Sequence, residues 1–76
     1  MAARAYILIE TQVGKSREAA EALRSLHGVP SVDIITGAFD IIALVEAPDM
    51  ISMADLVTGQ VQSISGVTRT ITCVAA

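Results

Sequence analysis

Two runs of apolar residues most limit the folds that are open to this chain. One run covers residues 5–9 and the other residues 41–45, and both are rich in aliphatic and β-branched side chains at consecutive positions. A strand that is apolar on both sides lies in the middle of a sheet whose two faces are covered. We therefore expect these two runs to form the central strands of one sheet.

Two further strands and a helix are predicted around them. Residues 32–36 and 67–74 alternate apolar with polar side chains, as edge strands do. Residues 15–26 repeat apolar side chains at helical spacing, and Gly28 is expected to end this helix. The third strand is predicted over residues 40–46, so that it contains the second apolar run.

A second helix is predicted to start after Asp49 and to end at Gly66. Asp49 is the expected N-cap, while Ser52 followed by Asp55 is a rival start. Gly59 lies inside this helix at a cost of about 1 kcal/mol relative to alanine, and we expect another backbone to come close there. The predicted apolar stripe of the helix consists of Met50, Met53, Ala54, Val57, Val61 and Ile64.

The predicted order of elements is therefore βαββαβ. Residues 25–29, which combine a helix end, a glycine and a strand entry, return in similar form as residues 63–67. Two βαβ halves with right-handed crossovers give the ferredoxin-like α+β fold, a four-stranded antiparallel sheet with two helices on one face. We expect residues 1–76 to form this single domain.

Apolar residues are abundant for a domain of this size. Hydrophobic residues make up 53% of the 76 residues, yet no stretch reaches the ~20 apolar residues of a membrane-spanning helix. The predicted helices cover only one face of the sheet, so the other face needs a cover. We expect a sheet-to-sheet homodimer, that is, a dimeric α/β barrel, and no membrane partner.

Charge and cysteine content exclude further classes of protein. The formal net charge is −3 and the sequence contains no basic run, which argues against direct binding to nucleic acid. The single cysteine, Cys73, cannot form an internal disulfide, and the N-terminus does not resemble a signal peptide. A reducing, cytoplasmic location is therefore expected.

Few residues are suited to catalysis or metal binding. His27 is the only histidine and follows the first predicted helix, where the helix dipole favours a solvent-exposed side chain. Cys73 has apolar neighbours, as an inert packed thiol does. No cysteine–histidine cluster has metal-ligand spacing, so neither a metal nor a cofactor is expected. The alternative is a small cofactor-free monooxygenase or isomerase on a dimeric ferredoxin-like barrel, but this needs a polar cleft that the aliphatic helix faces do not offer.

Three polar or aromatic features remain as candidate sites. Gly37 predicts a tight hairpin, because glycine adopts positive φ without steric cost. Asp40 follows beside apolar neighbours, where its carboxylate either caps the hairpin backbone or accepts a hydrogen bond from a ligand ammonium group. Thr70 and Thr72 share one face of the last strand and either meet solvent or line a groove. Phe39 either packs locally or anchors an interface.

The order and spacing of these residues resemble a known family. Residues 29–40 run from a valine to Thr-Gly-Ala-Phe-Asp, and residues 46–50 open the second helix with Glu-Ala-Pro-Asp-Met. Residues 66–72 read Gly-Val-Thr-Arg-Thr-Ile-Thr. Together, over essentially the whole chain, these segments resemble the C-terminal effector-binding domain of the Lrp/AsnC family of transcription regulators.

The resemblance implies an assembly and a site. Domains of this family dimerise through their sheets, and the dimers associate into rings, here an octamer or a decamer. Small effectors, usually amino acids, bind in the cleft between neighbouring dimers. Carried over to this sequence, the ligand-binding residues would be Gly37, Ala38, Phe39, Asp40, Thr70 and Thr72.

The chain departs from the family in two respects. Ala38 stands where the family often has a polar or acidic residue, so the resemblance does not assign the ligand. Full-length members carry an N-terminal helix-turn-helix domain, for which this chain has no room, and the resemblance is to the stand-alone members. A regulatory role would then act through protein partners, such as a full-length relative, rather than through DNA.

Overall fold

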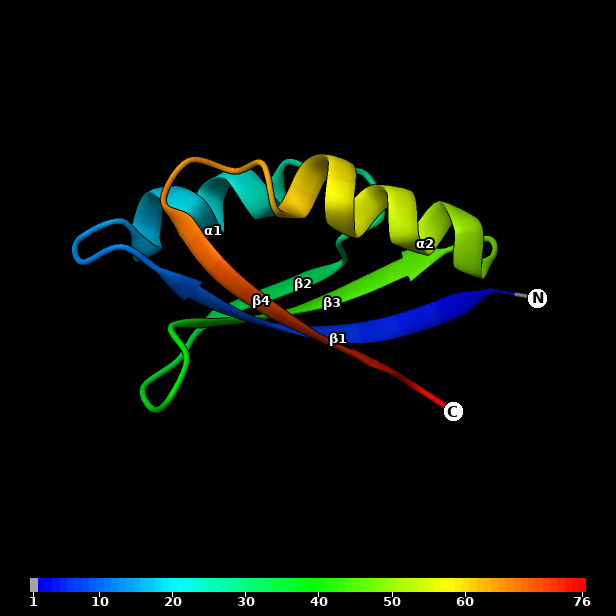
Figure 1. Cartoon of the computed structure of the whole chain (residues 1–76), viewed down its shortest axis with the longest axis horizontal. Coiled ribbons are helices and arrows are strands. Elements are labelled where there is room, and N and C mark those ends of the chain that lie inside the picture. The colour runs from blue at the N-terminus through cyan, green and yellow to red at the C-terminus, as the bar shows by residue number, and fades with distance from the viewer. Residues whose placement is uncertain (1) are drawn as a thin grey trace.

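The chain forms one four-stranded antiparallel sheet with both helices on the same face (Figure 1). The computed structural model describes residues 2–76, and Met1, the first residue of the predicted domain, lies outside them. The elements in chain order are β1 (Ala3–Thr11), α1 (Ser16–Arg24), β2 (Ser31–Ile34), β3 (Ile41–Ala47), α2 (Met50–Leu56), a π-helical segment η1 (Val57–Val61) and β4 (Val67–Val74).

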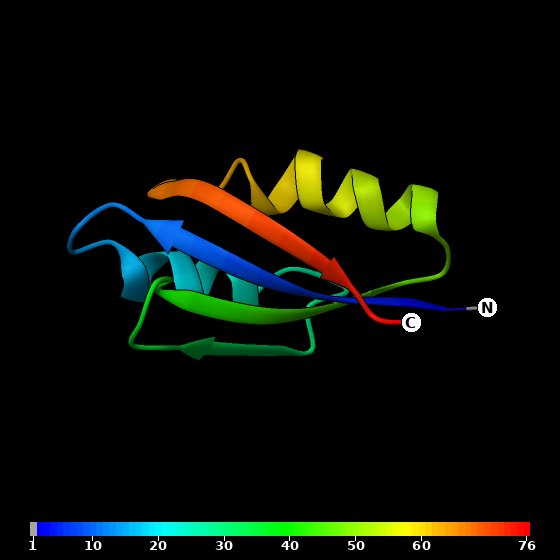
Figure 2. The ribbon, with the colours of Figure 1, turned by 60° about the horizontal axis from the view of Figure 1, so that its bottom comes forward.

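The strands lie in the order β2-β3-β1-β4, and Figure 2 shows them side by side. β1 pairs antiparallel with β3 on one side and with β4 on the other, while β2 pairs only with β3. The two apolar runs are therefore the central strands, as predicted. The ferredoxin-like α+β fold class is confirmed.

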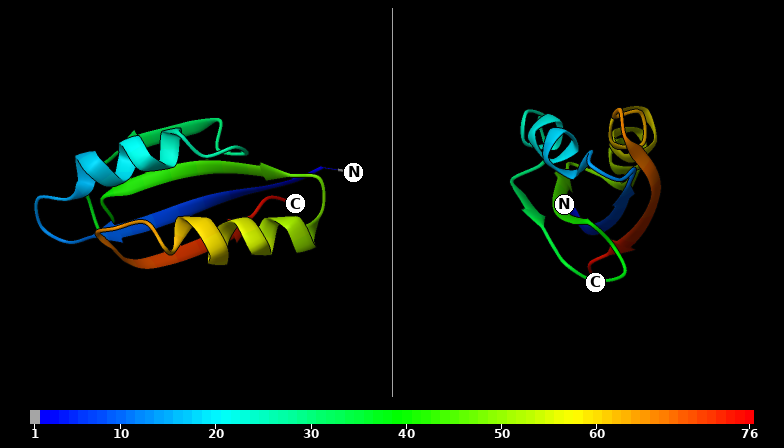
Figure 3. Two further views of the ribbon diagram at one scale, coloured as in Figure 1. Left: turned by 90° about the horizontal axis from the view of Figure 1, so that it is seen from above. Right: turned by 90° about the vertical axis from the view of Figure 1, so that its left-hand side faces the viewer.

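The hydrophobic core lies between the helices and one face of the sheet (Figure 3). Alternate residues of the two central strands point to this face, and almost none of their surface is exposed. Leu23 of α1 and Met53 of α2 pack against them. Burial of a large apolar side chain contributes about 1.5–3 kcal/mol, so this layer dominates the stability. The sheet residues are Ala5, Ile7 and Ile9 of β1 and Ile41, Ala43 and Val45 of β3.

The opposite face of the sheet, here called the open face, is also apolar, and no helix covers it (Figure 1). The register places Tyr6 opposite Leu44 and Cys73, and Leu8 opposite Ile42 and Ile71. Tyr6 is 43% exposed and Ile71 42% exposed. The prediction that the central strands are apolar on both sides is confirmed, whereas the dimer that would cover this face stays a prediction.

The first helix ends earlier than predicted. It stops at Arg24, where Ser25 is the C-cap and its hydroxyl donates to the Ala22 carbonyl at 2.7 Å. Gly28 therefore does not end the helix but lies in the turn before β2, with φ at +91°. A Cβ atom there would come 2.9 Å from the Glu46 carbonyl oxygen. Glycine is needed at this position because the turn passes close to β3.

The second helix also differs from its prediction. It continues only to Leu56 as an α-helix and then as the π-helical segment η1, which contains Gly59. A Cβ atom at Gly59 would meet nothing within 4 Å, so no other backbone segment of this chain comes close there. Within the predicted apolar stripe, Met50 and Ala54 are exposed, whereas Leu56, outside the stripe, is buried. These three residues lie in α2, before the π-helical segment, and the stripe residues inside that segment, Val57 and Val61, are buried as predicted.

The connection between β2 and β3 is longer than the predicted tight hairpin. β2 ends at Ile34 and β3 starts at Ile41, and the Ile35 N–H donates to the Asp40 carbonyl at 2.8 Å across the base of the loop. Gly37 does have positive φ, at 156°. The loop projects away from the helices, beyond the open face (Figure 1).

Asp49 caps α2, as predicted. Its backbone is extended, and its Oδ1 atom accepts a hydrogen bond from the Ser52 N–H at 2.7 Å. This bond, reinforced by the Ser52 side chain, holds the pKa of the Asp49 carboxyl below its ordinary value of 3.8. The rival start at Ser52 is not used, because Ser52 is already inside the helix.

The cap gives a pH-dependent stability. A lowered pKa in the folded chain means that Asp49 stabilises the fold above its unfolded pKa and that this contribution disappears as the pH falls through the folded pKa. Asp49→Ala is expected to lower Tm at pH 7, with a difference from wild type that shrinks toward pH 3. Thermal unfolding followed by circular dichroism measures this. Asp55→Ala, an exposed carboxylate later on the same helix, is the control and should show no comparable loss.

Candidate functional site

Thr70 and Thr72 face the helix side of the sheet. The register places Thr70 opposite Ile9 and Thr72 opposite Ile7, two side chains that are buried under the helices. Where β1 carries these two isoleucines, the paired positions of β4 carry side chains with hydroxyl groups. Thr70 is half-buried and Thr72 is exposed. These threonines therefore line the space beside α2 rather than the open face.

A groove of about 290 Å³ lies between α2 and β4, with Thr72 in its wall. Most of its lining is apolar, and its polar groups are two hydroxyls and one amide. A mainly apolar hollow with a few placed polar groups is the usual form of a small-molecule site. The lining residues are Met50, Met53, Ala54, Val57, Thr58, Gln62, Thr72 and Val74.

A second hollow, of about 330 Å³, continues along β4 and is lined by Thr70. Gln62 lines both hollows and so separates them. Its Nε2 atom donates to the Thr70 Oγ1 atom at 3.0 Å. Because Thr70 accepts this bond, its own hydroxyl hydrogen stays available as a donor, and Gln62 keeps its amide oxygen as an acceptor. The pair thus offers one donor and one acceptor side by side.

The π-helical segment positions Gln62. The Gln62 N–H donates to the Val57 carbonyl at 2.9 Å, the five-residue spacing of a π-turn. Single π-turns are frequent at functional sites. Gln62 was not among the predicted site residues, because a regular helical period does not direct it toward β4. The glycine at position 59 was the available indication that this helix is irregular.

Phe39 lies on the other side of the sheet. The Arg69 guanidinium stands over its ring, with 5.1 Å from Cζ to the ring centroid. Arg69 pairs in the ladder with Glu10 on the open face and approaches its carboxylate at 3.8 Å. A cation over an aromatic face is attractive by about 0.5–1 kcal/mol at an exposed site. Phe39 is therefore held by Arg69 against the end of the open face.

Asp40 is paired within the chain. Its Oδ2 atom accepts a hydrogen bond from the Thr11 N–H at 2.8 Å, and its own N–H donates to the Ile9 carbonyl at 2.9 Å. The carboxylate does not cap its own loop, as one reading of the sequence expected, but the end of β1. Sequence could not indicate this partner, because the two residues lie far apart in the chain.

The six predicted site residues thus form two groups within one protomer. Thr70 and Thr72 lie along β4 on the helix side, while Phe39 and Asp40 lie at the end of β1 and over the open face. Gly37 and Ala38 are exposed in the loop between β2 and β3. A site that contains both groups would need a second protomer.

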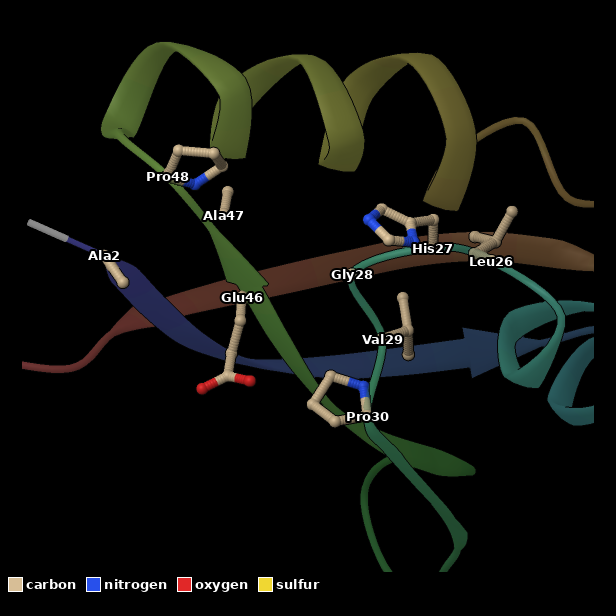
Figure 4. Close-up of a pocket in the computed structure, with 9 residues that line it drawn as sticks. All are labelled: Ala2, Leu26, His27, Gly28, Val29, Pro30, Glu46, Ala47 and Pro48. Carbon is tan, nitrogen blue, oxygen red and sulfur yellow. The ribbon is translucent and has the colours of Figure 1, made fainter.

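A larger hollow, of about 510 Å³, opens at the opposite end of the sheet (Figure 4). It is lined by the turn between α1 and β2 and by the end of β3. Figure 4 shows the Glu46 carboxylate directed to the opposite side of the ribbon from His27, so the two groups do not converge on one point. This hollow lacks the donor and acceptor pair of the β4 groove.

Other kinds of site find no support among residues 2–76. No three His, Cys, Asp or Glu side chains there lie close enough together to hold a metal ion. No helix in the same part of the chain is long and apolar enough to cross a membrane. Cys73 is an exposed free thiol rather than the packed one expected from its neighbours.

The chain is a small ferredoxin-like domain with a groove between α2 and β4. The family model described as the Lrp/AsnC ligand binding domain matches residues 4–76. The chain therefore belongs to the Lrp/AsnC ligand-binding domain family. A comparison with curated protein sequences gave no significant match.

Solved structures support this assignment. The protein TTHA0845 from Thermus thermophilus is 34% identical, with a TM-score of 0.92 over 97% of this chain and 92% of that one. FFRP-DM1 is 27% identical, with a TM-score of 0.94 over 97% of this chain and 99% of its own. The transcriptional regulator NMB0573 from Neisseria meningitidis, in complex with L-Met, is 22% identical and shares the fold with a TM-score of 0.86. The match covers 97% of this chain and 49% of the regulator.

The hydrogen bond from Thr11 to Asp40 can be tested by substitution. Asp40→Ala leaves a part-buried N–H without its acceptor and is expected to cost about 1–3 kcal/mol of unfolding free energy. Asp40→Asn should retain most of the stability, because its amide oxygen can accept the same bond. Urea unfolding measures both variants, with Asp33→Ala, an exposed carboxylate on β2, as the control. Equal losses in the Ala and Asn variants would contradict the assignment.

Proposed function

We propose that this chain is a module that binds a free amino acid and assembles with itself, and that it acts in regulation through protein partners. The observation that carries the proposal is the groove between α2 and β4, with its apolar walls and with the Gln62–Thr70 pair at its border with the second hollow. The family to which the chain belongs is a ligand-binding domain, which supports this reading.

The lining favours an amino acid with a neutral, apolar side chain. Met53, Val57 and Val74 offer aliphatic and thioether contacts, and none of the lining residues is charged. The polar groups of such a ligand can meet the hydroxyl of Thr72 and the amide of Gln62. The complex of the regulator NMB0573 with L-Met supports an amino acid of this kind.

The second half of the site comes from a neighbouring protomer. Within one chain the loop that carries Gly37, Ala38, Phe39 and Asp40 lies apart from the threonines of β4. A neighbour can bring its loop to the groove, and the Oδ1 atom of Asp40 then receives the ligand ammonium group while Oδ2 keeps its bond to Thr11.

The proposed assembly starts at the open face. Two copies pack sheet against sheet and bury Tyr6, Leu8, Ile42, Leu44 and Ile71, and the resulting dimers form a ring of eight or ten chains. The regulatory partner is a full-length relative of the same family, and these residues themselves do not bind DNA. The free thiol of Cys73 fits a reducing compartment, the cytoplasm.

No observation favours the enzymatic alternative. The groove residues include no histidine and no carboxylate, so the groove lacks a group for general acid–base chemistry. We therefore propose no catalytic role.

Ligand binding is tested by thermal shift against the twenty common amino acids. A ligand at about 100 times its Kd adds roughly 2.7 kcal/mol of stability, and we expect this shift from an apolar amino acid such as L-Met. Thr72→Val keeps the shape of the groove but loses one hydrogen bond, and should weaken binding about tenfold.

Ser63→Ala is the control, since this exposed hydroxyl bonds to the backbone and lines neither hollow. The proposal fails if no amino acid raises Tm. If Thr72→Val binds the amino acid as tightly as the wild type, the proposed location of the ligand in the groove is wrong.

The sheet-packed dimer is tested with Leu44→Glu. A carboxylate in the middle of the buried face would lack a partner, and monomers are expected at micromolar concentration. Sedimentation velocity gives the mass. Ile51→Asp, which changes an apolar side chain that is 78% exposed on α2, should keep the wild-type mass. An unchanged mass for Leu44→Glu would exclude the open face as the interface.

A further inference from the structure

The turn between β1 and α1 presents a fully exposed valine. Val13 is 103% exposed, more than any other large apolar side chain described. The turn forms one tip of the molecule, at the end of a long axis of 37 Å (Figure 1). When a partner covers a branched apolar side chain that is fully exposed to water, the free energy of the system falls.

Hydrogen bonds hold this turn rigid. Thr11 N–H is bound by Asp40 Oδ2 at 2.8 Å, and its hydroxyl shares a bond of 2.9 Å with that of Ser16. The Gln12 N–H donates to the Gly66 carbonyl at 2.8 Å, and the Lys15 N–H donates back to Gln12 at 3.0 Å. A tip that is already ordered loses little conformational entropy on binding, so its contact is more favourable than that of a mobile loop.

The other end of the molecule carries a matching hollow, here called the terminal hollow. It joins the hollow of about 510 Å³ in Figure 4 with an adjoining one of about 320 Å³. The two share His27, Gly28, Glu46, Ala47 and Pro48. The lining is mixed, and its apolar part, here called the apolar floor, includes Leu26, Val29 and Leu56.

The charges around the two ends are complementary. Lys15 and Arg17 follow Val13 closely in the chain, at the tip of the molecule. The Nζ atom of Lys15 also lies 3.6 Å from the Glu18 carboxylate, so Arg17 carries more of the complementarity. Glu46 and Asp55 line the terminal hollow. Opposite charges at the rim of a contact fix its register and speed association.

We infer that the turn of one copy docks into the terminal hollow of the next copy, with Val13 against the apolar floor and Lys15 and Arg17 toward Asp55 and Glu46. The turn that carries Val13, here called the knob, and the terminal hollow lie at opposite ends of the molecule. The contact is therefore heterologous and links copies head to tail. It names the surfaces that join dimers in the proposed assembly, and thus rests on that part of the proposed function. It does not depend on the ligand.

One such contact is small and therefore weak. A dimer packed through the open face carries two knobs and two hollows, so that neighbouring dimers can engage more than once and gain from the raised effective concentration. Assemblies larger than the dimer should consequently appear over a narrow range of concentration, and their stability should fall with added salt as the rim charges are screened.

The test is the mass of the ligand-free protein by sedimentation velocity and native mass spectrometry, across concentration and salt. Val13→Asp is expected to reduce the wild-type assembly to dimers while Tm stays unchanged, because the side chain contacts nothing in its own chain. Ile51→Asp, at an apolar position that is 78% exposed and lies outside the turn and the hollow, should assemble like the wild type. Assembly of Val13→Asp at wild-type mass overturns the inference, and so does a wild type that stays dimeric at all concentrations.

A charge exchange identifies the hollow. Arg17→Glu and Asp55→Lys should each raise the concentration needed for assembly several-fold at low salt, and the double variant should recover it. A double variant no better than the single ones overturns the docking site. Failure of the ligand proposal is separate, since it appears as no thermal shift with amino acids while the wild-type mass still falls in Val13→Asp.

Discussion

The structure depends on the burial of two central strands that are apolar on both sides. α1 and α2 cover one side and enclose Ile7, Ile9, Ile41 and Val45 almost completely. The same strands cannot turn their other side chains inward as well, so Tyr6 and its neighbours are left on an uncovered face. A chain of this length covers one face of its sheet by itself and leaves the second face apolar and open. The open face is thus a consequence of the same two strands that build the core, and it is the observation behind the proposed assembly.

The second constraint is that β4 continues the sheet without continuing the core. At the positions where β1 carries buried isoleucines, β4 carries Thr70 and Thr72, and α2 leaves a groove above them. The domain therefore gives up some apolar burial along one edge. The groove left there has mainly apolar walls, and Gln62, one of its few polar residues, is held by a hydrogen bond to Thr70. The groove proposed to bind a ligand is thus the place where the packing of the domain is incomplete.

The sequence was sufficient for local patterns and insufficient for contacts between distant segments. The central strands and the Asp49 cap follow from periodicity and from neighbours within three residues, so they were predicted. Asp40 was recognised as a carboxylate that needs a partner, but the partner, Thr11, is brought to it only by the pairing of β1 with β3. Gly28 was assigned to a helix end because its close approach to Glu46 is invisible in sequence.

The π-helical segment makes the length of the chain before β4 a determinant of the site. A π-turn contains one residue more than an α-turn. Loss of one residue from Val57–Val61 would close this turn as a regular α-turn, without the hydrogen bond from the Gln62 N–H to the Val57 carbonyl. The position of Gln62, and with it the hydrogen bond to Thr70 at the border of the two hollows, depends on this turn. Among relatives, insertions and deletions at this point should therefore change ligand preference more than substitutions in the walls do.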